Sequence, residues 1–196
     1  VLLYHVERMN EESANALLKV MEEPTEGVLF LLTADSLAGV LPTIRSRCIS
    51  FAMAPVSPAD CARYCTAQGV DKKDAELYSE LFDGHIGMVL AAARDEARRA
   101  QVDKAMTLAK AAAAGDSYSA AVLLAAYEKD KAGASALLTD LRAVAAAGLR
   151  GVSRAPVQGE TARRTLAAAD AAIQRLNAQV NPKITLTVLA SKFRTF

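Results

Sequence analysis

Residues 10–24 read Asn-Glu-Glu-Ser-Ala-Asn-Ala-Leu-Leu-Lys-Val-Met-Glu-Glu-Pro, and this stretch decides how the first part of the chain folds. Asn10 followed by two glutamates predicts a helix start, because the amide caps free N–H groups and the acids suit the positive end of the helix dipole. Pro24 ends the helix. Apolar residues at helical spacing predict one buried face, made of Ala14, Leu17, Leu18 and Met21.

Short apolar segments flank this helix. Residues 1–6 are β-prone and should form a strand that feeds it. Residues 28–33 form an apolar run too short for a helix, so we expect a strand covered on both faces, and residues 48–53 suggest another. A short helix opened by proline is expected at residues 41–44. This alternation predicts a parallel α/β arrangement over residues 1–53.

After residue 54 the pattern becomes purely helical. A Ser57-Pro58 start and two further amphipathic stretches predict a three-helix unit over residues 55–96. About five more helices are expected over residues 97–196, where Gly and Pro mark the breaks. The expected fold is therefore mainly α with an N-terminal α/β part, organised as domains 1–54, 55–96 and 97–196.

Composition narrows the class of protein. The chain has 196 residues, of which 52% are hydrophobic, and its 23 basic and 22 acidic residues leave a net charge of +1. A surface that is basic all over, as in proteins that wrap nucleic acid, is therefore excluded. Three cysteines in so long a chain favour a reducing compartment, so we expect a cytoplasmic protein, and we expect no membrane partner.

Cys61 and Cys65 lie four residues apart on an expected helix and could face one metal. A zinc site needs about four ligands, however, so buried thiols are the favoured interpretation. DNA or partner contacts are a further hypothesis for the basic residues of the helical part and of the first helix, although charged stripes on helices are often only solvated. These candidates are Lys19, Arg94, Arg98, Arg99, Arg163 and Arg164.

Three segments, in their order and spacing, resemble a known family. They are residues 15–24 (NALLKVMEEP), the run ending in Thr33, and residues 41–48 (LPTIRSRC). Together they are similar to the AAA+ clamp-loader subunits of bacterial DNA polymerase III, first the delta-prime branch and next gamma/tau. The resemblance implies that residues 1–54 are the C-terminal part of an AAA+ ATPase-like domain, residues 55–96 a helical lid and residues 97–196 a helical collar used in oligomerisation.

The resemblance also implies roles for single residues. Arg47, in the triplet Ser46, Arg47 and Cys48, corresponds to an arginine finger, which stabilises charge on the γ-phosphate of ATP bound by a neighbouring subunit. A salt-bridged surface arginine is the alternative. Thr33 stands where the family places a polar sensor near that phosphate, and a hydroxyl that only bonds strand-end backbone groups is equally compatible with its place.

Three positions depart from the pattern of hydrolysing members. Tyr4 and His5 stand where those members carry an Asp-Glu pair, and neither a phenol nor a neutral imidazole supplies the anionic oxygens that Mg²⁺ requires. Gly87 stands where a lid arginine would reach the γ-phosphate. A GxxxxGK[ST] phosphate loop is absent from the sequence. We therefore expect no catalysis in cis, no metal and no cofactor in this chain; the family's zinc module would precede residue 1.

The resemblance thus implies a non-hydrolysing stator of the delta-prime type. It would sit beside gamma/tau and delta subunits that bind ATP and Mg²⁺, and the assembly would load a sliding clamp onto primed DNA within the DNA polymerase III holoenzyme. Two alternatives stay open. One is an active gamma/tau-like ATPase with changed metal ligands, and the other is a helical adaptor of AAA+ ancestry.

Overall fold

The computed structural model describes residues 1–24, 26–53 and 56–195. The chain is mainly helical and divides into two compact units, residues 1–54 and residues 55–196. Each unit has its own hydrophobic core. The first unit carries the only strands among the described residues, and the second is built from helices alone.

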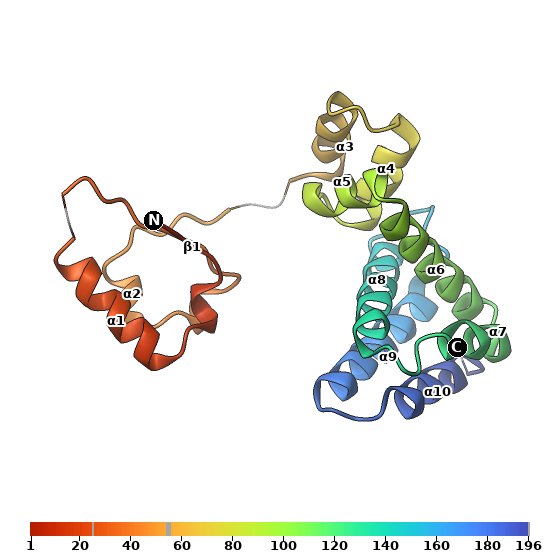
Figure 1. The fold of residues 1–196 in the computed structure, drawn as a ribbon. Helices are drawn as coiled ribbons and strands as arrows, with labels where there is room; N and C mark the ends of the chain where they lie inside the picture. The colour runs from red at the N-terminus through yellow and green to blue at the C-terminus, as the bar shows by residue number, and fades with distance from the viewer. Residues whose placement is uncertain (25, 54–55, 196) are drawn as a thin grey trace. The chain divides into compact units, whose positions relative to one another are not determined.

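The first unit is a small α/β structure. Strands β1 (Leu2–Leu3) and β2 (Leu31–Leu32) pair in parallel, with Leu2 opposite Leu31. The helices α1 (Glu11–Glu22) and α2 (Pro42–Arg45) lie against each other (Figure 1). The unit also contains two short 3-10 helices, η1 (Val6–Arg8) and η2 (Leu37–Gly39). The buried core consists of Val6, Ala14, Leu17, Val40 and Ile44.

Helix α1 starts and packs as its sequence predicts. The Asn10 side chain accepts a hydrogen bond from the Ser13 backbone N–H, which satisfies one of the free donors at the helix start. Ala14 and Leu17 are buried, and the other two members of the predicted face, Leu18 and Met21, are half-buried against the same core. The proline-opened helix at residues 41–44 is also confirmed, as α2.

The predicted strands are shorter than expected. Only two residues of each of the first two expected strands are paired, and residues 48–53 form no strand among the described residues. A strand needs a neighbour to accept and donate its backbone hydrogen bonds, and in the described part of the chain β1 and β2 pair only with each other.

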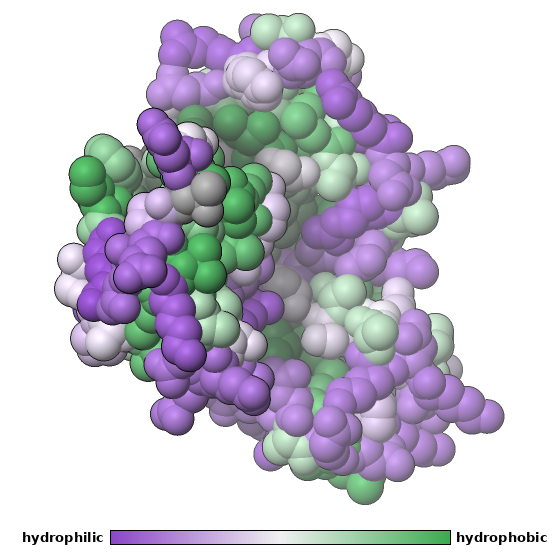
Figure 2. All heavy atoms as spheres, turned by 60° about the vertical axis from the view of Figure 1, so that its left-hand side comes forward, coloured by the Kyte–Doolittle hydropathy of each residue, from purple (hydrophilic) through white to green (hydrophobic). Residues whose placement is uncertain are grey.

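The prediction that residues 28–33 are covered on both faces is likewise wrong. Leu29 and Leu31 are 68% and 55% exposed, and Ile49, Phe51 and Met53 are all more than 80% exposed. Hydrophobic surface is visible on this unit in Figure 2, between hydrophilic side chains. The first unit therefore leaves apolar β-prone segments open to solvent.

The second unit contains eight helices in its described residues, as the sequence predicts. The first three of these helices correspond to the predicted three-helix unit. The first helix, α3, begins after its N-cap Ser57, whose side chain accepts a hydrogen bond from the Asp60 N–H. The elements are α3 (Pro58–Ala67), α4 (Lys72–Leu81), α5 (Ile86–Arg94), α6 (Glu96–Ala113), α7 (Ser117–Ala125), α8 (Lys131–Leu149), α9 (Gly159–Asn177) and α10 (Pro182–Phe193).

Helix α8 lies at the centre of this unit and packs against both α6 and α9 (Figure 1). A single hydrophobic cluster extends from Cys61 in α3 to Phe193 in α10, so α3–α5 and α6–α10 share one continuous core. Alanine and glycine let the backbones approach closely. A Cβ atom added to Gly148 would lie 1.9 Å from the carbonyl oxygen of Val157, so this position in α8 has no room for a side chain.

By length and composition alone, α8 is the one described helix that could span a membrane. Half of its apolar stretch is buried inside the unit, as in the core helix of a globular fold. Its middle also carries Asp140, which is only 1% exposed and bonds to Arg98 of α6. Contacts within the protein therefore account for the apolar character of α8.

Candidate functional site

Arg47 follows the C-terminal end of α2 and is held there by three groups. Its NH1 donates to the carbonyl oxygen of Thr43 at 3.0 Å and lies 3.4 Å from the hydroxyl of Ser46. Its NH2 donates to Oε1 of Glu22, the last residue of α1, at 2.5 Å. The side chain remains 37% exposed. The guanidinium is thus fixed in direction, and part of it still faces solvent.

This ion pair brings together two segments that carry the family resemblance. Glu22 belongs to residues 15–24 and Arg47 to residues 41–48, and the contact spans 25 positions of sequence. Glu22 is not among the residues singled out from the sequence, and its pairing is visible only in the structure. No spacing rule connects the two residues, because the contact depends on how α1 and α2 pack.

Tyr4, His5 and Thr33 lie at the ends of the two strands. Tyr4 is 68% exposed. The hydroxyl of Thr33 accepts a hydrogen bond from the His5 backbone N–H at 3.3 Å, and the Thr33 backbone N–H donates to Leu3. Thr33 therefore satisfies strand-end backbone groups in this structure, which is the structural role that its sequence position also allows.

His5 faces two carboxylates that the sequence did not single out. Its Nδ1 lies 3.3 Å from Glu7 Oε1 and 3.6 Å from Asp35 Oδ2, and the three ligand atoms all lie within 4.8 Å of one another. Arg8 lies 3.6 Å and 3.7 Å from the same two carboxylates and balances their charge. Distance would allow a cation here, but the arrangement is already an ion-pair network and we assign no metal to it.

The electrostatics of Glu7 agree with that description. Burial tends to raise its pKa, but hydrogen bonds from its own backbone N–H and from His5, together with the charges of His5 and Arg8, outweigh burial and lower the pKa overall. The carboxylate is therefore held in its charged form by groups within the protein.

Gly87 lies in the first turn of α5, and an added Cβ atom there would meet nothing within 4 Å. The space in which the family's lid arginine would stand is thus open at this residue. The absence of a side chain at Gly87 is not forced by packing, in contrast to Gly148.

Cys61 and Cys65 are both fully buried in α3. Burial, reinforced by the neighbouring Cys61, raises the pKa of the Cys65 thiol to about 11. A metal binds the thiolate form, and the raised pKa keeps this thiol protonated near neutral pH. The expectation of buried thiols is confirmed for these two residues, whereas Cys48 is only half-buried.

The five arginines proposed for DNA or partner contacts are all bonded within the second unit. Arg94 donates to the carbonyl of Gln68, Arg98 pairs with Asp140, and Arg99 pairs with Asp74. Arg163 and Arg164 share Glu160, and their hydrogen bonds to it lower the pKa of that exposed carboxyl to about 2. Their positive charges are therefore largely balanced by groups of the same chain.

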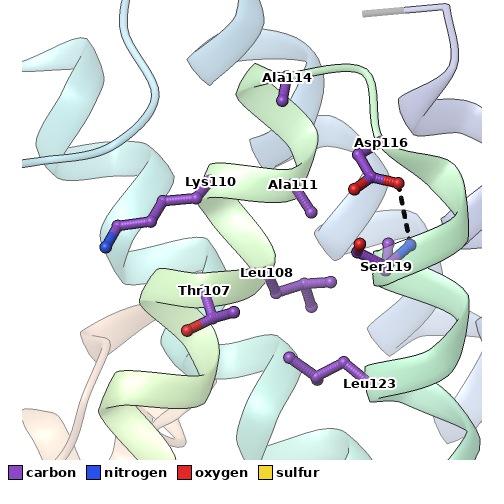
Figure 3. Close-up of a pocket in the computed structure, with 9 residues that line it drawn as sticks. Thr107, Leu108, Lys110, Ala111, Ala114, Asp116, Ser119 and Leu123 are labelled. Atoms are coloured by element: carbon purple, nitrogen blue, oxygen red, sulfur yellow. Dashed lines mark hydrogen bonds between the residues drawn. The ribbon is translucent and has the colours of Figure 1, made fainter.

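A cavity of about 280 Å³ lies between α6 and α7 (Figure 3). Its walls are mostly apolar, with Leu108 and Leu123 among them. Asp116 turns toward the Ser119 backbone N–H and caps α7, while the Lys110 amine points away from it. The polar groups at this cavity do not converge on a common point, so it shows no catalytic arrangement.

Comparison with known proteins identifies relatives of the first part of the chain. Residues 1–57 match the family model described as DNA polymerase III, delta subunit. A DNA polymerase III subunit delta' from Pseudomonas aeruginosa is 38% identical over 94 residues, which are 48% of this chain and 28% of that protein. The corresponding subunit of Escherichia coli is 32% identical over 125 residues, 63% of this chain and 36% of that protein.

A DNA polymerase III subunit gamma from Buchnera aphidicola is 37% identical over 59 residues, covering 30% of this chain and 16% of that protein. The chain thus spans about a third or less of the length of these relatives. The matched region of the family model contains both Glu22 and Arg47. The resemblance of this chain to subunits of bacterial DNA polymerase III, with delta-prime and gamma subunits among its relatives, is therefore confirmed.

Proposed function

We propose that the chain is part of a non-hydrolysing, delta-prime-like subunit of the DNA polymerase III clamp loader. The observation that carries this proposal is the match of residues 1–57 to the DNA polymerase III delta-subunit family, because it includes Arg47 and both segments that Arg47 joins. In the proposed assembly, Arg47 reaches the γ-phosphate of ATP on a neighbouring subunit, where a guanidinium fork stabilises transition-state charge.

The residues at the family's catalytic positions support a subunit without its own hydrolysis. Tyr4 and His5 replace the two acids that hold Mg²⁺ and orient water, and His5 is engaged with Glu7 and Asp35. Gly87 carries no charge toward a phosphate. ATP and Mg²⁺ would therefore be held by the gamma/tau neighbours rather than by this chain.

The helices of the second unit would then serve as lid and collar. We assign α3–α5 to the lid and α6–α10 to the collar, and their shared core would make the two move together as one stator. The partners in this proposal are gamma/tau and delta, with the sliding clamp and primed DNA reached through the complex in the cytoplasm.

Reconstitution tests the proposal. The full chain is mixed with gamma/tau and delta subunits and assembly is followed by size-exclusion chromatography, while ATP turnover is measured on the chain alone. The proposal requires assembly and no turnover. Turnover abolished by His5→Ala would favour an active ATPase, and failure to join gamma/tau would favour an adaptor that has kept the fold only.

A further inference from the structure

The two terminal nitrogens of the Arg47 guanidinium bind different kinds of partner. NH1 contacts only neutral oxygens, the carbonyl of Thr43 and the hydroxyl of Ser46, which both belong to α2 or its C-terminal end. NH2 donates to the Glu22 carboxylate, and within the described part of the chain this is the one ion pair of Arg47. The bond between NH2 and Glu22 is therefore the charged contact that an anion from outside the chain has to replace.

Glu22 gains from this pairing because of where it stands. It is the last residue of the twelve-residue helix α1, where the partial negative charge of the last carbonyls disfavours a carboxylate. The next residue, Glu23, is a second exposed acid. Among the residues that the structure describes, Arg47 is the one ion-pair partner of Glu22. When Arg47 leaves, the carboxylate loses the charge that balances it.

The pair is nevertheless weak enough to be exchanged. The Glu22 and Arg47 side chains are 51% and 37% exposed, so water screens their attraction, and a pair of this kind shifts an equilibrium by about fivefold at most. Arg47 thus has a bound state on Glu22 and a released state. A ligand that binds only the released state meets an apparent affinity that is lowered by the fraction of Arg47 held on Glu22.

We propose that Glu22 is an autoinhibitory partner of Arg47 that raises the concentration of ATP at which the assembled loader works. This inference rests on the proposed function, in which Arg47 reaches the γ-phosphate of ATP on a neighbouring subunit. A γ-phosphate at the subunit boundary displaces Glu22 from NH2, whereas a nucleoside diphosphate has no phosphate at that place and leaves the pair intact. Glu22 is a positioning residue here, because it acts on Arg47 and does not touch the nucleotide.

The test uses loaders reconstituted from the full chain with gamma/tau and delta subunits, in which hydrolysis is measured over a range of ATP concentrations. The site that Arg47 serves is isolated as the hydrolysis that Arg47→Ala removes. At this site Glu22→Gln should lower the half-saturating ATP concentration by about two- to fivefold and leave the maximal rate unchanged. Inhibition by ADP should also be unchanged. The shift should disappear near 1 M salt, where charges are screened within about 3 Å.

Glu23→Gln is the matched control. It removes the same charge one position away, from a side chain with no recorded contact to Arg47 among the described residues, and should leave the ATP dependence unchanged. A double variant separates direct from indirect effects, since Glu22→Gln added to Arg47→Ala should hydrolyse ATP like Arg47→Ala alone.

The outcomes separate this inference from the function on which it rests. If Arg47→Ala leaves hydrolysis unchanged, the proposed function fails and the autoinhibitory role of Glu22 fails with it. If Arg47→Ala loses hydrolysis while Glu22→Gln and Glu23→Gln give the same ATP dependence, only the role of Glu22 is overturned. A lower maximal rate with Glu22→Gln would also overturn it, because Glu22 would then help Arg47 to act instead of holding it back.

Discussion

Arg47 NH2 lies 2.5 Å from Glu22 Oε1, so a residue two positions past the end of α2 is tied to the last residue of α1. This contact gives Arg47 a partner inside its own chain before any neighbouring subunit is present. An arginine finger must be able to exchange such a partner for a phosphate, and an exposed carboxylate is a suitable one because the pair is weak in water. Glu22 would then orient the guanidinium and still be able to release it to a phosphate.

The weakness of this pair gives a first prediction. Glu22→Gln should change the free energy of unfolding of the chain by no more than about 1 kcal/mol, because Glu22 is 51% exposed and water screens the charges. Thermal unfolding by circular dichroism measures the change. A loss of several kcal/mol would mean that Arg47 is chiefly a structural residue of the first unit.

The buried pair in the second unit should behave differently. Arg98 donates to Asp140 at 2.6 Å and also stacks on Phe82 of the preceding helical group, and the Asp140 side chain is 2% exposed. Asp140→Asn should therefore destabilise the chain by about 3 kcal/mol, since it leaves the partly buried Arg98 guanidinium, 21% exposed, without its counter-charge. Asp74→Asn, which breaks the exposed pair with Arg99, is the matched control and should cost less than about 1 kcal/mol. Equal decreases in the free energy of unfolding of the two variants, measured by urea unfolding, would contradict the greater importance of the buried Arg98–Asp140 pair.

Two glycines make a second matched pair. Gly148→Ala should destabilise the second unit by about 2 kcal/mol, because the new methyl group would overlap the carbonyl of Val157. Gly87→Ala should stabilise it by about 0.5 kcal/mol, because the site is open and alanine is the better helix former. Melting temperatures that shift in the same direction for both variants would show that the backbone contact at Gly148 is not present in solution.

The buried thiol predicts a pH dependence. Burial and the neighbouring Cys61 raise the pKa of Cys65 to about 11 in the folded chain, whereas an unfolded thiol titrates at about 8.5. As the pH rises between these values, the unfolded chain loses its proton first. The contribution of the protonated Cys65 thiol to the free energy of unfolding is therefore complete below about pH 8.5 and is lost as the pH approaches 11.

Urea unfolding across that pH range measures the effect. Cys65→Ala should show a shallower fall in the free energy of unfolding than the native chain. Parallel curves for the two proteins would mean that Cys65 does not titrate with a raised pKa in the folded state.

Helices could be predicted well from this sequence because their signals are local. Asn10 and Ser57 mark starts that the structure reproduces, and apolar spacing locates the buried faces. The strands could not be predicted as well, since a strand depends on pairing with a segment elsewhere in the chain. Ile49, Phe51 and Met53 have the right composition and yet remain unpaired and exposed among the described residues.

The candidate site shows the same division. Arg47 stands out in the sequence because its triplet resembles a family motif, and the residue types at Tyr4, His5 and Gly87 can be read directly. The partners of these residues cannot be predicted from the sequence, because they come together only through tertiary packing. Glu22 lies 25 positions from Arg47 in the sequence, and Asp35 lies 30 positions from His5. The hydroxyl of Thr185, which has no partner among the described residues, is likewise a property of three-dimensional structure, and threonine in a helix gives no sequence signal for it.

The central claim is that Arg47 acts on a neighbouring subunit's ATP, and one comparison tests it most directly. Loaders are reconstituted with the native subunit, Arg47→Ala, Arg47→Lys or Glu22→Gln, and DNA-stimulated ATP hydrolysis is measured alongside assembly. The account predicts that Arg47→Ala and Arg47→Lys assemble normally and lose hydrolysis at one site by about 10³-fold or more, while Glu22→Gln hydrolyses ATP like the native loader. Unchanged hydrolysis with Arg47→Ala, or an equal loss with Glu22→Gln, would contradict it.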